Sequence, residues 1–164
     1  MTAALAAATG TVPAVGGQAP DFELVNQYGE PVRLSTFRGQ SVVLVFYPFA
    51  FSGICTGELC EVRDNLALFE DANAAVLAVS VDSKFSLRAY AAQEGYTFDL
   101  LSDFWPHGAA ASLYGVFDHS SGMAQRGTFI IDAGGTIRYS VVNPRGQARD
   151  FSEYRKALVR LVKA

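Results

Sequence analysis

The most constraining feature of this sequence is a run of apolar, β-forming residues that leads into a cysteine-containing segment. Val42 to Phe46 has the composition of a strand that is buried on both faces of a sheet. The apolar residues that follow recur at helical spacing: Leu59, Val62, Leu66 and Phe69. This spacing predicts a helix from about Thr56 to Glu70, with Cys55 at its start.

A cysteine at the start of a helix has unusual electrostatic surroundings. The first backbone N–H groups of a helix have no partners within it, and the helix dipole is positive at that end. Such a position can lower the pKa of a thiol from about 8.5 to roughly 3.5–7.5. Because the thiolate is the nucleophilic form, the position of Cys55 indicates a reactive cysteine and therefore an enzyme.

The rest of the chain alternates between strands and helices. In chain order the expected elements are a hairpin over Asp21–Leu34, a helical turn over Ser35–Arg38, the strand Ser41–Phe46, the helix from Thr56, the strand Ala75–Val81, a helix ending near Glu94, the strand Phe98–Leu101, the helix Ala109–Tyr114, a hairpin over Thr128–Val142 and a closing helix from Phe151. This order predicts a single α/β domain with a mixed sheet.

Capping and turn residues set the expected ends of these elements. Ser35 is expected to cap the short helical turn, and Asp82 or Ser83 to cap the helix that stops at Gly95. The stretch from Asp132 to Gly135 has the composition of a hairpin turn. Four apolar residues share one face of the closing helix: Phe151, Tyr154, Leu158 and Leu161.

Charge and hydropathy argue against several classes of partner. The chain has 13 Lys and Arg against 16 Asp and Glu, a net charge of −3 and no basic cluster, which gives little attraction for nucleic acid. No apolar run approaches the roughly 20 residues that a membrane-spanning helix needs. Residues 1–15 are rich in Ala and lack the Lys or Arg of a Sec-type signal peptide. We therefore expect a loosely ordered extension over residues 1–15, one domain over residues 16–164 and a cytoplasmic location.

The two cysteines do not form a familiar structural or metal motif. Cys55 and Cys60 are separated by four residues, which is neither a small secreted disulfide scaffold nor the Cys-x-x-Cys motif of thioredoxin-like reductants. The two histidines, His107 and His119, lie far along the chain and do not meet zinc-site spacing. We expect no metal. No Gly-x-Gly-x-x-Gly or phosphate-loop pattern indicates a nucleotide cofactor.

Several motifs together resemble one known family. Pro48-x-x-x-Ser52-x-x-Cys55 resembles the Pro-x-x-x-Thr/Ser-x-x-Cys motif of the peroxiredoxins (AhpC/TSA), and Arg126 to Asp132 resembles the strand that carries their active-site arginine. Cys55 to Glu58 and Ser102 to Gly108 are most similar to the alkyl hydroperoxide reductase E group. The resemblance extends from about Val15 to the C-terminus. It implies a thioredoxin-like fold, a peroxide substrate and no cofactor, because the cysteine itself is the redox centre.

The resemblance assigns a role to each residue of the motif. Cys55 would be the peroxidatic cysteine, whose thiolate attacks a peroxide and becomes a sulfenic acid. Ser52 would hydrogen-bond the thiolate and the peroxide, and Pro48 would shield the sulfur from water. Arg126 would stabilise the thiolate and polarise the O–O bond, with Glu58 orienting the arginine. Each residue also has a simpler interpretation. Cys55 could be a buried small hydrophobe, Ser52 a cap or turn residue, and Pro48 the end of a strand. Arg126 could be a solvated charge at a strand edge, and Glu58 an acid that favours the helix dipole.

Cys60 departs from the group that the other motifs resemble. A cysteine five positions after the peroxidatic one resembles the resolving cysteine of the PrxQ group, also called bacterioferritin comigratory proteins. On an ideal helix, positions i and i+5 have Cα atoms about 8.7 Å apart, whereas disulfide-bonded Cα atoms rarely exceed about 6.8 Å. A Cys55–Cys60 disulfide therefore requires residues 54–61 to unwind, which Gly53 and Gly57 would ease. The alternative is an inert Cys60.

The reductant depends on that choice. An internal disulfide suits thioredoxin, whereas a bare sulfenic acid suits a low-molecular-weight thiol with a mycoredoxin- or glutaredoxin-like partner. Two other functions remain open: a thiol–disulfide exchange protein that uses both cysteines, and a non-catalytic module that keeps the scaffold.

The residues Phe49 and Phe51 and the stretch Phe104 to Pro106 offer aromatic surface, so we expect a homodimer. The phenylalanines near the site favour access for organic hydroperoxides.

Overall fold

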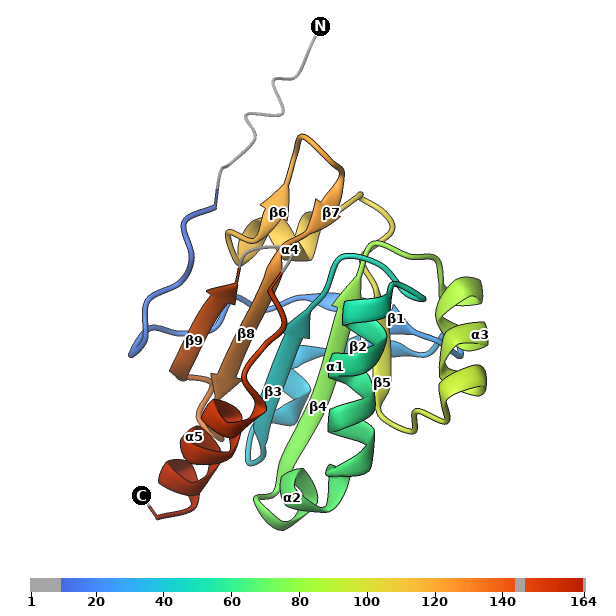
Figure 1. Cartoon of the computed structure of the whole chain (residues 1–164). Helices are drawn as coiled ribbons and strands as arrows, with labels where there is room; N and C mark the ends of the chain where they lie inside the picture. Colours follow the sequence, from blue (N-terminus) through green and yellow to red (C-terminus); the bar gives the residue numbers. More distant parts are fainter. Residues whose placement is uncertain (1–9, 144–146, 164) are drawn as a thin grey trace, which may run out of the picture.

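The computed structural model describes residues 10–143 and 147–163 (Figure 1). Its strands are β1 (Glu23–Asn26), β2 (Pro31–Arg33), β3 (Ser41–Phe46), β4 (Ala74–Ser80), β5 (Asp99–Ser102), β6 (Phe117–Asp118), β7 (Met123–Ala124), β8 (Arg126–Ile131) and β9 (Ile137–Asn143). Its helices are α1 (Gly53–Asp64), α2 (Leu66–Asp71), α3 (Lys84–Glu94), α4 (Ala109–Leu113) and α5 (Phe151–Lys163), with a 3₁₀ turn over Leu34–Phe37.

Seven strands form one mixed sheet in the order β2-β1-β5-β4-β3-β8-β9. The three central strands β3, β4 and β5 are parallel, whereas β8 and β9 continue the sheet on one side and β1 and β2 on the other in antiparallel pairings. A separate hairpin is formed by β6 and β7. The parallel centre follows from helical crossovers, which the alternating sequence pattern predicts.

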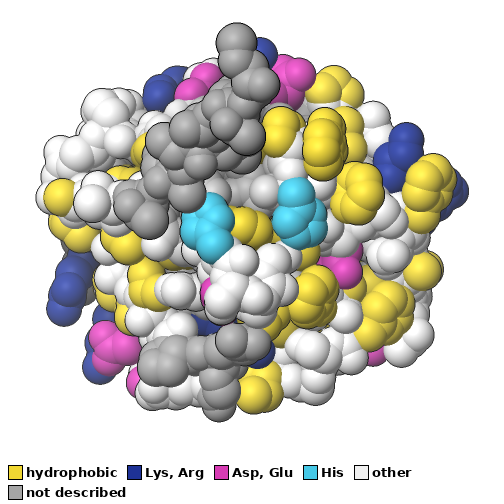
Figure 2. Space-filling view, turned by 90° about the horizontal axis from the view of Figure 1, so that it is seen from above, with side chains coloured by type: hydrophobic (Ala, Val, Ile, Leu, Met, Phe, Trp, Pro, Cys, Tyr) yellow, Lys and Arg dark blue, Asp and Glu magenta, His cyan; other side chains and the backbone are white. Residues whose placement is uncertain are grey.

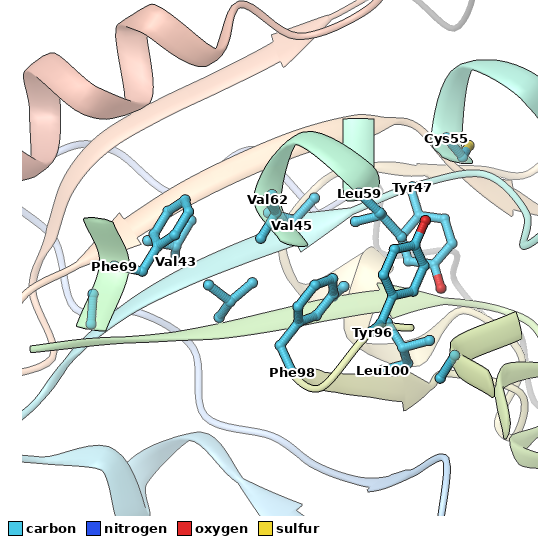
Figure 3. Packing of buried hydrophobic residues seen from close by; sticks show 14 of the residues in the cluster. Val43, Val45, Tyr47, Cys55, Leu59, Val62, Phe69, Tyr96, Phe98 and Leu100 are labelled. Atoms are coloured by element: carbon cyan, nitrogen blue, oxygen red, sulfur yellow. The ribbon is translucent and has the colours of Figure 1, made fainter. Parts of the chain in front are cut away.

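The sheet separates two hydrophobic cores because the side chains of β3 alternate between its faces. Val43 and Val45 contribute to a core with residues of α1, α2, α3 and α5, shown in part in Figure 3. Val42, Leu44 and Phe46 contribute to the opposite core, which includes residues of α4. Figure 1 shows the same division, with α1 and α5 lying over one face of the sheet. The prediction that β3 is buried on both faces is confirmed.

Most of the predicted elements are present, with boundaries that agree or are shifted by up to three residues. Both hairpins form, and the Ser83 hydroxyl caps α3 by accepting a hydrogen bond from the Ser86 amide at 3.3 Å. Gly95 ends α3 in the left-handed conformation, at φ +72°. In α5, Tyr154 and Leu158 are buried as the periodicity predicts. The β6–β7 hairpin was not predicted, because each strand has only two residues.

Two local predictions are wrong. Ser35 does not cap the helical turn with its side chain; its backbone amide instead donates to the carboxylate of Asp21 at 2.9 Å. The expected helix over residues 56–70 begins earlier, at Gly53, and is divided into α1 and α2 at Asn65. The side chain of Asn65 donates to the Glu61 carbonyl at 2.8 Å, which is the local competition for backbone groups that makes asparagine unfavourable inside helices.

Part of the expected N-terminal extension, residues 1–9, lies outside the described residues. The segment that follows contacts the domain: a Cβ atom on Gly115, at the end of α4, would lie 2.3 Å from the Gly10 carbonyl oxygen and 2.5 Å from the Val12 nitrogen. Gly115 therefore permits a close approach between the two backbones, at φ +66°. Further on, the Gly16 amide donates to the Ile137 carbonyl at 2.8 Å.

Asp103, directly after β5, gives the fold a pH-dependent contribution to stability. Its buried carboxylate accepts hydrogen bonds from the Ala110 and Ala111 amides at 3.0 and 2.9 Å. Burial raises the pKa of Asp103 from 3.8 to about 6, against the opposing effect of the amide hydrogen bonds. Because the folded pKa is raised, the stabilising contribution is complete below about pH 4 and is lost as the pH rises through 6.

We therefore expect the free energy of unfolding of the wild type, relative to Asp103→Asn, to fall between pH 4 and 7. A shift of this size corresponds to roughly 3 kcal/mol. Urea unfolding of both proteins at several pH values measures this difference. Taking the difference between the two free energies cancels the contribution of every other titrating group. A difference that stays constant, or rises with pH, contradicts the argument.

Candidate active site

Cys55 lies in the first turn of α1, as predicted, just beyond the end of the central strand β3. Its side chain is buried and belongs to the core on the α1 face of the sheet. Figure 3 shows Cys55 at one end of that core, beyond Tyr47. Burial raises the pKa of the Tyr47 and Tyr90 hydroxyls, and the nearby Cys55 side chain raises both further. Both phenols therefore stay protonated beside the sulfur.

The loop that leads to Cys55 is held from outside α1. The Ala50 amide donates to the Asp82 carboxylate at 2.8 Å, and the same carboxylate oxygen accepts from the Ser80 hydroxyl at 2.7 Å. Phe51 has a positive φ of 67°, which is costly for a residue with a bulky side chain. Its ring packs on Tyr90 with a centroid distance of 4.9 Å, and this contact helps to maintain the conformation.

Ser52 is the residue before α1, but its hydroxyl does not cap the helix. Its backbone carbonyl accepts the first hydrogen bond, from the Thr56 amide at 2.9 Å. Its side chain makes no capping hydrogen bond, and the buried Oγ atom has no hydrogen-bond partner among the described residues. Ser52 therefore occupies the cap position that its simpler interpretation expects, but its side chain takes no part in capping. A buried hydroxyl without a partner is costly, so the Ser52 Oγ has an unused capacity to hydrogen-bond a group at the start of α1.

Arg126 and Glu58, which are 68 positions apart, form a buried ion pair in which the Arg126 Nη1 donates to the Glu58 Oε1. Arg126 begins β8, two residues before Thr128, which pairs with Val45 near the end of β3. The sheet register thus places Arg126 next to the C-terminal end of β3, where the loop that leads to Cys55 begins. Glu58 is less than one helical turn after Cys55. The interpretation of Arg126 as a solvated strand-edge charge is wrong, because the side chain is buried.

Arg149 is a member of this cluster that the sequence analysis missed. Its backbone amide donates to the Glu58 Oε2 at 2.7 Å, and its Nη1 donates to the Glu58 Oε1 at 3.1 Å. The Nη2 group donates to the carbonyls of Phe46 and Gly127, at the ends of two neighbouring strands. In the sequence, Arg149 stands next to Asp150 in a polar stretch before the closing helix, where a solvated charge is the ordinary expectation.

The cluster of Glu58, Arg126 and Arg149 carries a net charge of +1, since one carboxylate is shared by two guanidinium groups. All three side chains are buried. Solvent screens such a charge less than it screens a surface charge. The excess positive charge adds to the positive end of the α1 dipole, and both favour an anion near the first turn of the helix.

Cys60 lies on a different side of α1 and is partly exposed. Its sulfur is 3.4 Å from the Tyr96 hydroxyl and 3.6 Å from the Glu94 carboxylate. Both cysteines are free thiols, and the helix is continuous from Gly53 to Asp64. An intact helix keeps their Cα atoms about 8.7 Å apart, which is too far for a disulfide.

Within residues 10–143 and 147–163, no group of three or more Asp, Glu, His or Cys side chains is arranged to hold a metal ion. His107, one of the two histidines, hydrogen-bonds the Gly122 carbonyl at 2.7 Å and contacts the Phe117 ring. In the same part of the chain, none of the helices has the length and apolar character that crossing a membrane requires.

The fold is thioredoxin-like, and the candidate site combines a buried thiol at the start of a helix with a buried carboxylate, less than one helical turn further on, that pairs with two buried arginines. The comparison with known families specifies this class further. Residues 15–140 match the AhpC/TSA family, and the chain belongs to that family.

Relatives of known identity agree with this assignment. The chain is 47% identical over 148 residues to alkyl hydroperoxide reductase E of Mycobacterium tuberculosis, covering 90% of this chain and 97% of that protein. Reduced 2-Cys peroxiredoxin of Plasmodium vivax has a similar structure, with a TM-score of 0.79, 29% identity and coverage of 90% and 81%. Peroxidoxin BcpB of M. tuberculosis has a TM-score of 0.77, 31% identity and coverage of 90% and 95%. This kinship supports an enzyme of the thiol-dependent peroxidase class.

Because two buried arginines share the Glu58 carboxylate, we expect its loss to lower the free energy of unfolding. Glu58→Gln leaves two buried guanidinium groups without an anion, and breaking a buried ion pair in this way typically costs roughly 3–5 kcal/mol. Urea unfolding measures the loss. Glu61→Gln, on the exposed side of the same helix, is the matched control and should change stability by about 0.5 kcal/mol or less. Equal stability of the two variants contradicts the assigned role of Glu58.

Proposed function

We propose that this protein reduces hydrogen peroxide and organic hydroperoxides through Cys55. The observation that supports this most strongly is that a buried cysteine in the first turn of α1 lies three positions before Glu58, the buried carboxylate that pairs with two buried arginines. The Cys55 thiolate attacks one peroxide oxygen, the O–O bond breaks, and water or an alcohol leaves after taking up a proton. Cys55 is oxidised to a sulfenic acid as the peroxide is reduced.

The other motif residues have proposed roles in the same step. Ser52, whose Oγ atom is buried without a partner among the described residues, donates a hydrogen bond to the thiolate or the peroxide. Pro48 shields the sulfur from water. Arg126 stabilises the charge on sulfur and on the departing oxygen, and Glu58 holds the guanidinium in place through the ion pair. Arg149 acts as a positioning residue, through Glu58.

The surroundings of Cys55 favour organic hydroperoxides among the substrates. Phe49, Phe51 and Ile54 flank the site in sequence and are 41%, 48% and 38% exposed. Exposed apolar side chains beside a reactive group offer a surface for the alkyl part of a substrate.

For the second half of the cycle we propose that Cys60 resolves the sulfenic acid. The Cys60 thiol attacks the Cys55 sulfur, a disulfide forms and water leaves. The step requires the helix to unwind within residues 54–61, and nothing lies within 4 Å of a Cβ built on Gly53 or Gly57. Thioredoxin then reduces the disulfide. The alternative is an inert Cys60 with recycling by a low-molecular-weight thiol and a mycoredoxin- or glutaredoxin-like protein, as the resemblance of the sequence motifs to the alkyl hydroperoxide reductase E group implies.

A thiol–disulfide exchange protein that uses Cys55 and Cys60 is a second candidate function. The free thiols of both residues on one helix support it.

The proposed cycle in each case requires Cys55 to be reduced, and thioredoxin and low-molecular-weight thiols keep thiols reduced in the cytosol. The proposed location is therefore cytoplasmic.

Three proteins test the proposed chemistry: the wild type, Cys55→Ser and Cys60→Ser. We expect rapid consumption of hydrogen peroxide by the wild type and by Cys60→Ser in the first turnover, and none above the buffer rate by Cys55→Ser. After one equivalent of peroxide, non-reducing peptide mapping should find a Cys55–Cys60 disulfide in the wild type and a sulfenic acid in Cys60→Ser.

The other outcomes separate the alternatives. A persistent sulfenic acid in the wild type contradicts resolution by Cys60 and leaves the one-cysteine cycle. A wild-type rate constant close to that of free cysteine thiolate, together with reduction of insulin, contradicts the peroxidase and favours the exchange protein.

We also propose a homodimer. Apolar side chains gather on the face seen in Figure 2, and the aromatic residues outside the core include Phe85, Phe104 and Trp105, which is 80% exposed. Exposed aromatic clusters of this kind are typical of interfaces.

Light scattering of the wild type should give the mass of two chains, and Trp105→Ser should weaken the association by more than tenfold because aromatic anchors dominate interfaces. Ser121→Ala, a change on an exposed turn, is the control. A monomeric wild type at micromolar concentration contradicts the proposal.

A further inference from the structure

Two residues at the end of α3 contact Cys60. Gly95 adopts the left-handed conformation and turns the chain at the end of the helix, so Glu94 and Tyr96 lie on either side of the turn. The Tyr96 hydroxyl is 3.4 Å and the Glu94 Oε2 is 3.6 Å from the Cys60 sulfur. Tyr96 is buried, and Figure 3 shows its side chain pointing toward α1.

The same part of the protein also binds the first turns of α1, at Thr56. The Tyr96 hydroxyl donates to the Thr56 carbonyl at 3.3 Å, and the Tyr90 hydroxyl, from α3, donates to the Thr56 Oγ1 at 3.0 Å. Farther along α1, the Arg63 Nη1 donates to the Glu94 carbonyl at 2.6 Å. The side of α1 that carries Cys60 is thus hydrogen-bonded to α3 and the turn after it at Thr56, Cys60 and Arg63.

These hydrogen bonds oppose the movement that a Cys55–Cys60 disulfide needs. The Cα atoms must approach from about 8.7 Å to within about 6.8 Å, which the helix cannot allow while its first turns are intact. The Cys60 sulfur must also leave Tyr96 and Glu94 to reach Cys55. Thr56 lies between the two cysteines, so the opening of this segment breaks its bonds to Tyr90 and Tyr96.

We propose that Tyr96, with Glu94 and Tyr90, forms a latch that keeps Cys60 away from oxidised Cys55 and sets how fast the two cysteines join. This inference rests on the proposed function, since it concerns the fate of the Cys55 sulfenic acid. Tyr96 is a positioning residue: it acts on Cys60 and Thr56 and does not touch the peroxide.

The latch determines which of two reactions consumes the sulfenic acid. In one, the Cys60 thiol displaces the hydroxyl from the Cys55 sulfur, giving a disulfide and water. In the other, a second peroxide transfers an oxygen atom to Cys55, giving a sulfinic acid and water or an alcohol. A tighter latch lengthens the life of the sulfenic acid and increases the share that is lost as sulfinic acid.

Tyrosine-to-phenylalanine variants test the latch because they remove only a hydroxyl. Tyr96→Phe and Tyr90→Phe should each accelerate hydrogen exchange in the α1 peptides of the reduced protein, by about fivefold for each hydrogen bond lost. At graded peroxide concentrations, both should raise the ratio of disulfide to sulfinic acid by a similar factor. The matched control is Tyr114→Phe, since Tyr114 is also buried and donates to the Pro20 carbonyl at 2.7 Å, in the core on the opposite face of the sheet.

The hydrogen-exchange and oxidation measurements distinguish the ways in which the inference can fail. Equal exchange in α1 for Tyr96→Phe and Tyr114→Phe overturns the latch, and Tyr90→Phe provides the same test if Tyr96→Phe does not fold. Faster exchange with an unchanged product ratio overturns its control of the reaction. If Cys55 reacts with peroxide but no disulfide forms in any variant, this inference fails and the peroxidase proposal stands. If Cys55 does not react with peroxide, the proposed function fails, and the exchange rates alone decide whether the latch holds α1.

Discussion

The carboxylate of Glu58 is the interaction on which the rest of the site depends. It joins three segments that are remote in sequence: α1, the start of β8 at Arg126, and the residues before α5 at Arg149. A buried guanidinium without an anion is strongly unfavourable, so each arginine requires this carboxylate to be in place. The same contact fixes the first turns of α1 relative to the sheet. The position of Cys55 and the positive charge behind it therefore have a common origin.

The sequence was sufficient wherever a single local pattern decides the structure. The buried strand β3, the two hairpins, the Ser83 cap and the Gly95 terminus follow from residue type and spacing, and they form as expected. Ser35 failed as a cap because the turn begins one residue earlier, at Leu34, so Ser35 lies inside it. Its amide donates to Asp21, a residue 14 positions earlier that no local rule connects to it.

Arg149 shows the same limit within the site. Its partner Glu58 is 91 positions away, and an arginine beside an aspartate in a polar stretch has the local pattern of a solvated charge. Arg126 has a similar local pattern and was identified only because a family motif surrounds it. The pairing of β8 with β3 is what brings it to the Cys55 edge of the sheet. The position of Cys55 at the start of a helix can be predicted from the sequence. The assembly of Glu58, Arg126 and Arg149 into one buried cluster depends on tertiary contacts.

The structure also indicates which part of α1 can move. Glu58 lies between the two cysteines, and unwinding that displaces it breaks two charged contacts, at a cost of roughly 3–5 kcal/mol. The contacts at Thr56 and Cys60 are mostly neutral hydrogen bonds, each worth about 1 kcal/mol. A conformational change that keeps Glu58 in place and opens the turn between Gly53 and Gly57 therefore costs less than unwinding through Glu61. In the proposed cycle such an opening frees the Cys55 end of α1 while Arg126 and Arg149 stay paired with Glu58. The Cys60 sulfur still has to leave Tyr96 and Glu94 before the disulfide forms.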